Sequence, residues 1–321
     1  MQRIIENMKQ KSHELLESGA ATSVLAWKQG DLAYSSSPAL FNSSDELLSM
    51  HYDGFCGSNL SKYLIEQGKS DGKTLVFLKP CDTYSLNQLL GEQRVNREKV
   101  HAIGIGCKGK LDINKLNEQD IKGVLEIIDD GENLKIKTLY GDTTCERKSV
   151  LLEKCLSCKG KEHKIYDELI GDELSTETPE GDRLSQIIEL EDKTSDERYA
   201  FWRSELSKCI RCNACRDVCP ACTCNKCVFE NPQSGIAGKV NTTEFEENLY
   251  HIIRGYHVAG RCSDCGECTG VCPQGVPLHL INRKFIKDMN NFYGVFQAGE
   301  TAELNSPLLR FDFDDIEPKE R

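Results

Sequence analysis

The sequence predicts an α/β amino-terminal domain with a mainly parallel sheet, followed by a mainly α-helical domain. The chain has 321 residues, more than one domain usually holds. Strand and helix patterns alternate in the first half, and most of the 17 cysteines are bunched in the second. We expect the α/β domain over residues 1–160, an acidic linker over 161–195, the helical domain over 196–295 and an acidic tail over 296–321.

Composition excludes several classes of protein. The formal net charge is −11, whereas nucleic-acid binding needs a basic face, so we expect no nucleic-acid partner. The longest apolar runs, residues 75–78 and 102–105, are far too short for a membrane span. No secretory signal pattern follows Met1, and we therefore expect a cytoplasmic protein.

The first half has the pattern of a parallel sheet with crossover helices. We expect helices over residues 2–17, 61–66 and 83–90, and strands over residues 23–28, 74–79 and 100–106. A strand–helix–strand order favours a right-handed βαβ unit, and ligands of such sheets bind beyond the carboxyl ends of the strands. Cys81 and Cys107 each follow such an end. We therefore expect their thiols to lie close together.

Two cysteine runs in the second half share the spacing C-x₂-C-x₂-C-x₃-C-P. The first run covers residues 209–220 and the second covers residues 262–273. Bacterial ferredoxins use this spacing, in which three thiolates hold one 4Fe–4S cluster and the fourth reaches the other cluster. We therefore assign to cluster 1 Cys209, Cys212, Cys215 and Cys272, and to cluster 2 Cys262, Cys265, Cys268 and Cys219.

Other uses of these thiols are less consistent with the spacing. An odd cysteine count leaves one residue outside any all-disulfide scheme, and thiols in a reducing compartment bind metal or do redox chemistry. Zinc is the competing metal, but it needs only four ligands and usually pairs two C-x-x-C units. A zinc-bound structural scaffold is therefore kept as an alternative.

Helices are expected around and between the two runs. Thr243 and Glu246 form a capping box at the start of an apolar periodic segment in the stretch between the runs. Residues 199–206 and 278–289 have helical patterns on either side. This order resembles the helical two-cluster ferredoxin modules of heterodisulfide reductases and of succinate or fumarate dehydrogenases, which relay electrons between a donor site and an acceptor site.

The remaining cysteines suggest further metal sites. Cys155 and Cys158 form a C-x-x-C pair that, with Cys81 and Cys107, supplies four thiols for a third cluster; the alternative is a thioredoxin-type redox pair. A further metal site, or a set of buried thiols, accounts for Cys222, Cys224 and Cys227. Either Cys56 or Cys145 would then supply the fourth ligand of the site formed by Cys222, Cys224 and Cys227, and the other would be a free thiol.

Three short motifs in the first half resemble one known family. They are the KPCD segment at residues 79–82, the strand end at residues 104–107, and Cys155-x-x-Cys158 followed by YDELIG at residues 166–171. They resemble the β-subunit family of deazaflavin-reducing hydrogenases and formate dehydrogenases over residues 50–175. The resemblance implies FAD, an iron–sulfur cluster, and passage of hydride or electrons between a deazaflavin and partner subunits.

A flavin site has weaker support in the residues themselves. No G-x-G-x-x-G motif follows a strand. The loop containing Gly54, Gly57, Ser58 and Asn59 could cradle a phosphate through its backbone N–H groups, with Lys79 and Lys108 adding positive charge. An ordinary turn is the alternative.

These patterns predict an electron-transfer subunit of a cytoplasmic oxidoreductase complex of formate dehydrogenase, hydrogenase or heterodisulfide-reductase type. It would relay electrons through two 4Fe–4S clusters, or through three or four if the other thiols also bind iron. Its partners would be other redox subunits of the complex, or ferredoxin. An FAD enzyme that splits a hydride into single electrons is the second hypothesis.

Overall fold

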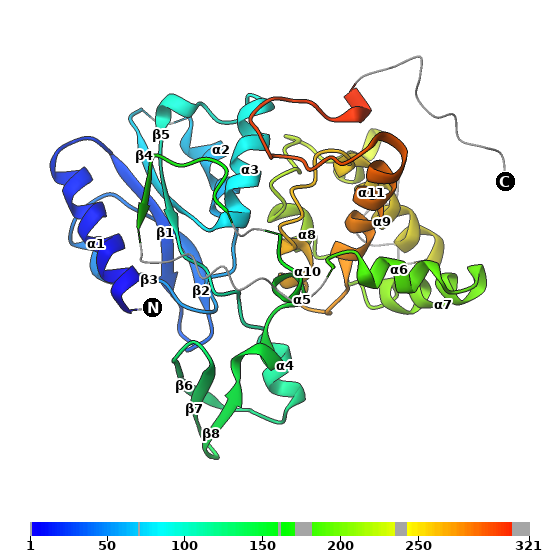
Figure 1. The fold of residues 1–321 in the computed structure, drawn as a ribbon, viewed down its shortest axis with the longest axis horizontal. Helices are drawn as coiled ribbons and strands as arrows, with labels where there is room; N and C mark the ends of the chain where they lie inside the picture. The colour runs from blue at the N-terminus through cyan, green and yellow to red at the C-terminus, as the bar shows by residue number, and fades with distance from the viewer. Residues whose placement is uncertain (1, 70, 160–161, 171–181, 235–242, 310–321) are drawn as a thin grey trace.

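The computed structural model describes residues 2–69, 71–159, 162–170, 182–234 and 243–309. Figure 1 shows a sheet with its covering helices beside a group of helices formed by the second half of the chain. The predicted fold class, an α/β part followed by a helical part, is confirmed.

The main sheet has six strands in the order β2-β1-β4-β5-β9, with β3 pairing β1. Its strands are β1 (Ser23–Gln29), β2 (Ser36–Phe41), β3 (Met50–His51), β4 (Thr74–Leu78), β5 (Val100–Ile105) and β9 (Glu168–Ile170). The pairs β1–β4, β4–β5 and β5–β9 are parallel, whereas β2 and β3 run antiparallel to β1. The three strands expected from the sequence are therefore neighbours in one parallel sheet.

Two helices cover opposite faces of this sheet (Figure 1). On one face α1 (Gln2–Glu17) buries Met8 against the strands, and on the other α3 (Pro80–Gly91) buries Leu86 and Leu89. The expected helix over residues 61–66 is a 3-10 turn followed by α2 (Leu64–Gln67). These side chains and the buried strands form the main hydrophobic core.

Helix α3 begins three residues earlier than the sequence pattern suggested. Pro80 occupies the first turn, where its missing N–H would have no helical partner in any case. The carboxylate of Asp82 then accepts a hydrogen bond from the backbone N–H of Lys79 at 3.2 Å. Asp82 therefore caps the helix from inside its first turn.

A second, smaller sheet was not expected from the sequence. It consists of the antiparallel strands β6 (Val124–Asp129), β7 (Asn133–Thr138) and β8 (Gly141–Glu146). Helix α4 (Ile113–Glu118) precedes these strands in the chain. Leu116, Leu134 and Ile136 are buried in a core of its own. Figure 1 shows it projecting from the α/β part.

Part of the expected acidic linker belongs to the main sheet. Strand β9 lies within residues 161–195 and pairs with β5. The carboxylate of Asp167 accepts a hydrogen bond from the N–H of Ala102 at 2.8 Å and from Arg97 at 2.6 Å, which holds the segment at the sheet edge. The same segment includes α6 (Ser185–Glu191), while residues 171–181 lie outside the described residues. The α/β part thus extends to residue 170.

The helical part is built around the two cysteine runs. Its helices are α7 (Ser195–Leu206), α8 (Ala214–Asp217), α9 (Glu244–Val258), α10 (Glu267–Gly270) and α11 (Leu278–Tyr293), while α5 (Glu153–Leu156) belongs to the α/β part and contacts this region through Lys154. The capping box predicted at Thr243 and Glu246 is present at the start of α9. At Gly255, α9 approaches α11 so closely that a Cβ atom would lie 2.7 Å from Phe285. Among the described helices, none combines the length and apolar character needed to cross a bilayer.

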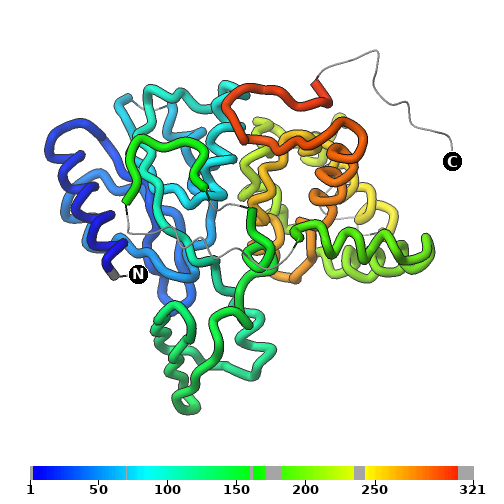
Figure 2. The backbone as a smooth tube through the Cα atoms, in the orientation of Figure 1, coloured from blue at the N-terminus to red at the C-terminus, as the bar shows by residue number. Residues whose placement is uncertain are grey.

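The chain after α11 returns to the α/β part. Figure 2 shows this segment crossing back toward α3. Asn87 of α3 donates a hydrogen bond to the carbonyl of Gly299 at 3.0 Å, and a Cβ atom on Gly299 would lie 1.9 Å from the carbonyl oxygen of Tyr84. The expected acidic tail is therefore packed against α3 at its beginning. The acidic aromatic segment at residues 311–315 lies outside the described residues.

We expect Leu86→Ala to lower the free energy of unfolding by about 2–5 kcal/mol, because Leu86 is fully buried between α3 and the sheet. Urea unfolding followed by far-UV circular dichroism measures the change. The matched control is Leu48→Ala, at a side chain that is 81% exposed, which should change stability by at most about 0.5 kcal/mol. Equal effects of the two substitutions would contradict this packing.

Candidate metal centres

The two cysteine runs fold into loops with the same backbone conformation. Arg211 and Asp264, which occupy equivalent positions, have φ angles of 56° and 51°. Asn213 and Gly266 are also equivalent, with φ angles of 64° and 66°, and each is followed by a short helix, α8 or α10. The repeat in the sequence is therefore a repeat in three dimensions. Within each loop the thiols lie close enough for the charge of one to raise the pKa of another.

Backbone amides in both loops donate to sulfur. The N–H of Arg211 lies 3.4 Å from Sγ of Cys209, and the N–H of Asp264 lies 3.4 Å from Sγ of Cys262. Such N–H···S contacts are among the features that set the reduction potential of an iron–sulfur cluster. These thiols, with amides aimed at them, form a donor set that fits 4Fe–4S clusters.

The fourth cysteine of the first run faces the second run. Burial raises the pKa of Cys262, Cys265 and Cys268, and the charge of Cys219 raises each of them further. Cys219 therefore lies among the three cysteines of the second loop.

A reciprocal arrangement surrounds the first loop. Burial raises the pKa of Cys215, and the charges of Cys272, Cys212 and Cys219 raise it further. Cys272, the last cysteine of the second run, thus lies beside the first loop. The crossed ligand assignment is compatible with these neighbours and stays a prediction.

Four further thiols form two pairs, and one thiol of each pair follows the carboxyl end of a strand, β4 or β5. The expected closeness of Cys81 and Cys107 stays a prediction. Burial raises the pKa of Cys81, and the charge of Cys158 raises it further; the same holds for Cys155 and its neighbour Cys107. The N–H of Lys110 lies 3.3 Å from Sγ of Cys155. We refer to Cys81, Cys107, Cys155 and Cys158 as the third cysteine group.

The other cysteines have different surroundings. A hydrogen bond from the thiol of Cys219 lowers the pKa of Cys222 to about 7. Cys224 is exposed, and Cys227 lies within reach of Arg216. A metal site formed by Cys222, Cys224 and Cys227 stays a prediction.

The two candidates for a fourth ligand lie in the amino-terminal half. Cys56 is buried beside His51 and Asp53, with its sulfur 3.4 Å from a carboxylate oxygen of Asp53. Cys145 lies on β8 and packs against the smaller core. Neither position is part of the two cysteine runs.

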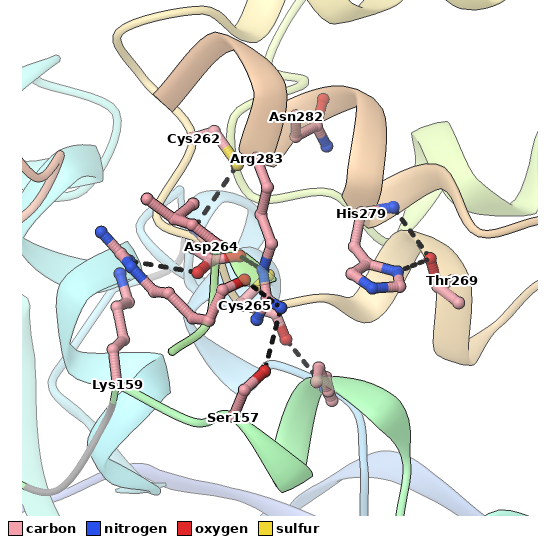
Figure 3. Close-up of polar contacts among 12 residues, drawn as sticks. Ser157, Lys159, Cys262, Asp264, Cys265, Thr269, His279, Asn282 and Arg283 are labelled. Carbon is pink, nitrogen blue, oxygen red and sulfur yellow. Dashed lines mark hydrogen bonds and ion pairs between the residues drawn. The ribbon is translucent and has the colours of Figure 1, made fainter. Parts of the chain in front are cut away.

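Buried charged side chains, which the sequence did not predict, connect the second loop to its surroundings (Figure 3). Nε of Arg283, on α11, lies 2.9 Å from a carboxylate oxygen of Asp264, and both side chains are 2% exposed. Arg283 also donates to Ser157 at 3.0 Å, while Arg183 lies 3.1 Å from Asp264. Burial alone would raise the pKa of Asp264, but the charges of Arg283 and two further cations hold it below its ordinary value. The network ties the Cys155–Cys158 segment to the second loop.

The residues expected to bind a flavin make contacts inside the protein. Asn59 is fully buried and donates to Ser85 at 2.8 Å. Lys79 is 1% exposed and lies 2.9 Å from both Asp82 and the carbonyl of Ser58. Their polar groups are therefore satisfied without a phosphate. Of the rest of the set, Gly54 packs against a leucine side chain, Gly57 lies in the same loop, and the carbonyl of Lys108 accepts from an arginine. A bound flavin stays a prediction of the family resemblance.

Two equivalent cysteine loops with C-x₂-C-x₂-C-x₃-C-P spacing define an iron–sulfur protein of the two-cluster electron-transfer class. Comparison with known families agrees, because residues 205–276 match the family described as the 4Fe-4S dicluster domain. Two 4Fe–4S clusters are thereby indicated.

The chain is homologous over most of its length to β subunits of F420-dependent formate dehydrogenases. It is 23% identical to the β subunit of the Methanocaldococcus jannaschii enzyme, covering 83% of this chain and 84% of that protein. It is 26% identical to the β subunit of formate dehydrogenase 1 of Methanococcus maripaludis, covering 67% and 71%. The resemblance predicted from the sequence is confirmed.

More limited similarities exist to two other proteins. The iron–sulfur subunit of Bacillus subtilis succinate dehydrogenase is 30% identical over 114 residues, covering 30% of this chain and 42% of that protein. A chain of the F420-reducing nickel–iron hydrogenase complex of Methanosarcina barkeri aligns at 18% identity with a TM-score of 0.37. That alignment covers 47% of this chain and 58% of the other.

We expect Asp264→Leu to lower the free energy of unfolding by about 3–5 kcal/mol, because it leaves the buried Arg283 without its partner. Denaturant unfolding of the anaerobic protein measures the loss. As control, Lys122→Gln removes an ion pair with Asp120 whose side chains are 62% and 87% exposed. That change should cost at most about 1 kcal/mol. A small effect at Asp264 would show that Arg283 is not held by this pair.

Proposed function

We propose that this chain is the iron–sulfur β subunit of an oxidoreductase complex of the F420-dependent formate dehydrogenase or hydrogenase type. It passes electrons between a donor site in the α/β part and partner redox subunits. The observation that supports the proposal is that the charge of Cys219 raises the pKa of second-loop cysteines, while the charge of Cys272 raises the pKa of Cys215 in the first loop. The names of the relatives and the dicluster match support the same class.

The ligand sets follow the crossed arrangement. Cluster 1 is held by Cys209, Cys212, Cys215 and Cys272, and cluster 2 by Cys262, Cys265, Cys268 and Cys219. When bound, a 4Fe–4S cluster accepts and releases one electron at a time. The protein fixes the position of the sulfurs through the two loops and donates backbone N–H groups to them. It thereby sets both the distance between the clusters and their potentials.

The third cysteine group is proposed to hold a third cluster. It lies where parallel strands end, which is where α/β sheets bind their ligands. Arg283 and Asp264 connect its Cys155–Cys158 segment to the loop of cluster 2. Electrons from the α/β part would thus enter the helical part at cluster 2.

The opposite end of the route lies near the surface. Cys212 is exposed, and the neighbouring Ile210 is 59% exposed. A partner redox subunit that docks over this loop would come within short range of cluster 1. The cysteine usage favours a reducing compartment, so we place the complex in the cytoplasm.

We expect the anaerobically purified chain to contain at least about eight iron and eight acid-labile sulfide ions, and about twelve of each if the third group also holds a cluster. Native mass spectrometry with elemental analysis gives these counts, and flavin released by acid would be detected in the same sample. Zinc in place of iron would contradict the proposal and favour a structural scaffold.

We expect Cys219→Ser to perturb the EPR signal of cluster 2, although residue 219 belongs to the first run. The reason is that its sulfur lies among those of the second loop. Cys145→Ser, a change to a partly buried thiol on β8, is the matched control and should leave both signals intact. Loss of the cluster 1 signal alone in Cys219→Ser would show that the ligands are not exchanged.

A further inference from the structure

The three cysteine groups are arranged in sequence through the fold, with cluster 2 in the middle. The segment that carries Cys155 and Cys158 packs on the second loop, and the second loop shares ligands with the first. There are therefore two junctions, one between the third group and cluster 2 and one between clusters 2 and 1. A buried cation lies at each junction.

Lys154 occupies the first junction. It precedes Cys155 on α5 and is buried. Its ammonium donates to the carbonyl of Cys265 at 2.9 Å and pairs with the carboxylate of Glu267. Its stem lies directly against Gly266, where a Cβ atom would be 2.5 Å from Cδ of Lys154. The side chain thus reaches from one thiol group into the loop of the next.

The charges around Lys154 come from both groups. Burial alone would lower its pKa, but Glu267, Cys155, Cys81 and Cys265 together raise it well above its usual value. Two of these thiols belong to the third group and one to cluster 2.

Arg254 occupies the second junction. It projects from α9, the helix inserted between the two runs, and is 6% exposed. One guanidinium nitrogen lies 3.2 Å from Sγ of Cys215, and another donates to the carbonyl of Cys215 at 3.0 Å. Its Nε atom is buried and has no hydrogen-bond partner among the described residues.

Thiols of both clusters lie close to this guanidinium. Burial alone would lower the pKa of Arg254, but the charges of Cys215, Cys219, Cys222 and Cys268 raise it above its ordinary value. Cys215 belongs to cluster 1, whereas Cys219 and Cys268 belong to cluster 2. Arg254 therefore lies between the two clusters.

We propose that Lys154 and Arg254 are positioning residues at the two junctions, and that each raises the reduction potential of both clusters beside it. This inference rests on the proposed function. A reduced cluster carries one more negative charge than an oxidised one, so a nearby cation stabilises the reduced form. The interaction is strong in a buried site and falls with distance. Arg254 therefore acts mainly on clusters 1 and 2, and Lys154 mainly on cluster 2 and the third cluster.

The test is an EPR-monitored redox titration of the anaerobic full-length protein with two charge-removing variants. Arg254→Gln should lower the potentials of clusters 1 and 2 and leave the third unchanged. Lys154→Gln should lower those of cluster 2 and the third cluster and leave cluster 1 unchanged. In Lys154→Gln the unpaired Glu267 carboxylate acts in the same direction. The control is Lys122→Gln, at an exposed lysine, which should shift none of them.

Charge-conserving variants separate the electrostatic role from a structural one. Arg254→Lys and Lys154→Arg should retain iron and shift the potentials less than the glutamine variants do. If a glutamine variant loses iron only from the two clusters beside it and the charge-conserving variant retains it, the junction assignment is supported. Equal iron loss in both variants of a pair would overturn it.

The inference can fail without the proposed function. Wild-type protein that lacks iron and sulfide refutes the proposed function itself. Wild-type clusters whose potentials do not change in either glutamine variant refute only the role of the two cations.

Discussion

The arrangement of the helical part depends on one constraint of the proposed function: each cysteine loop supplies three thiols to a cluster, and the fourth comes from the other loop. The two runs therefore have to lie side by side, although a long stretch of chain separates them. The equivalent φ angles at Asn213 and Gly266 give both loops the same turn. In the proposed ligand sets, Cys219 and Cys272 then fix the relative position of the two loops.

The intervening chain turns this constraint into an electrostatic environment. Helix α9 packs against α11 at Gly255 and directs Arg254 toward the thiols. Burying a cation costs solvation energy, which is offset only where opposite charge lies close by. Thiolate ligands provide that charge, so a buried arginine here indicates a strongly anionic site rather than an ordinary core.

Polar contacts join the α/β part to the cluster region. Ser85 of α3 lies 2.6 Å from the hydroxyl of Ser263 in the second loop, and Arg283 reaches Ser157. Asn87 of the same helix holds the returning chain at Gly299. Such contacts fix orientation at short distances. They keep the third cysteine group at a defined separation from cluster 2, as stepwise electron transfer requires.

The sequence by itself determined the features that depend on local spacing. The cysteine intervals, the strand–helix–strand order around residues 74–106 and the capping box at Thr243 are all set by neighbours along the chain. Tertiary structure decided what depends on distant partners. The three-residue strand β9 exists only because β5 offers an open edge, and periodicity cannot reveal a strand that short. The burial of Lys154, Arg254 and Arg283 is likewise invisible in the sequence, because a charged side chain is expected at the surface until the fold supplies its counter-charge.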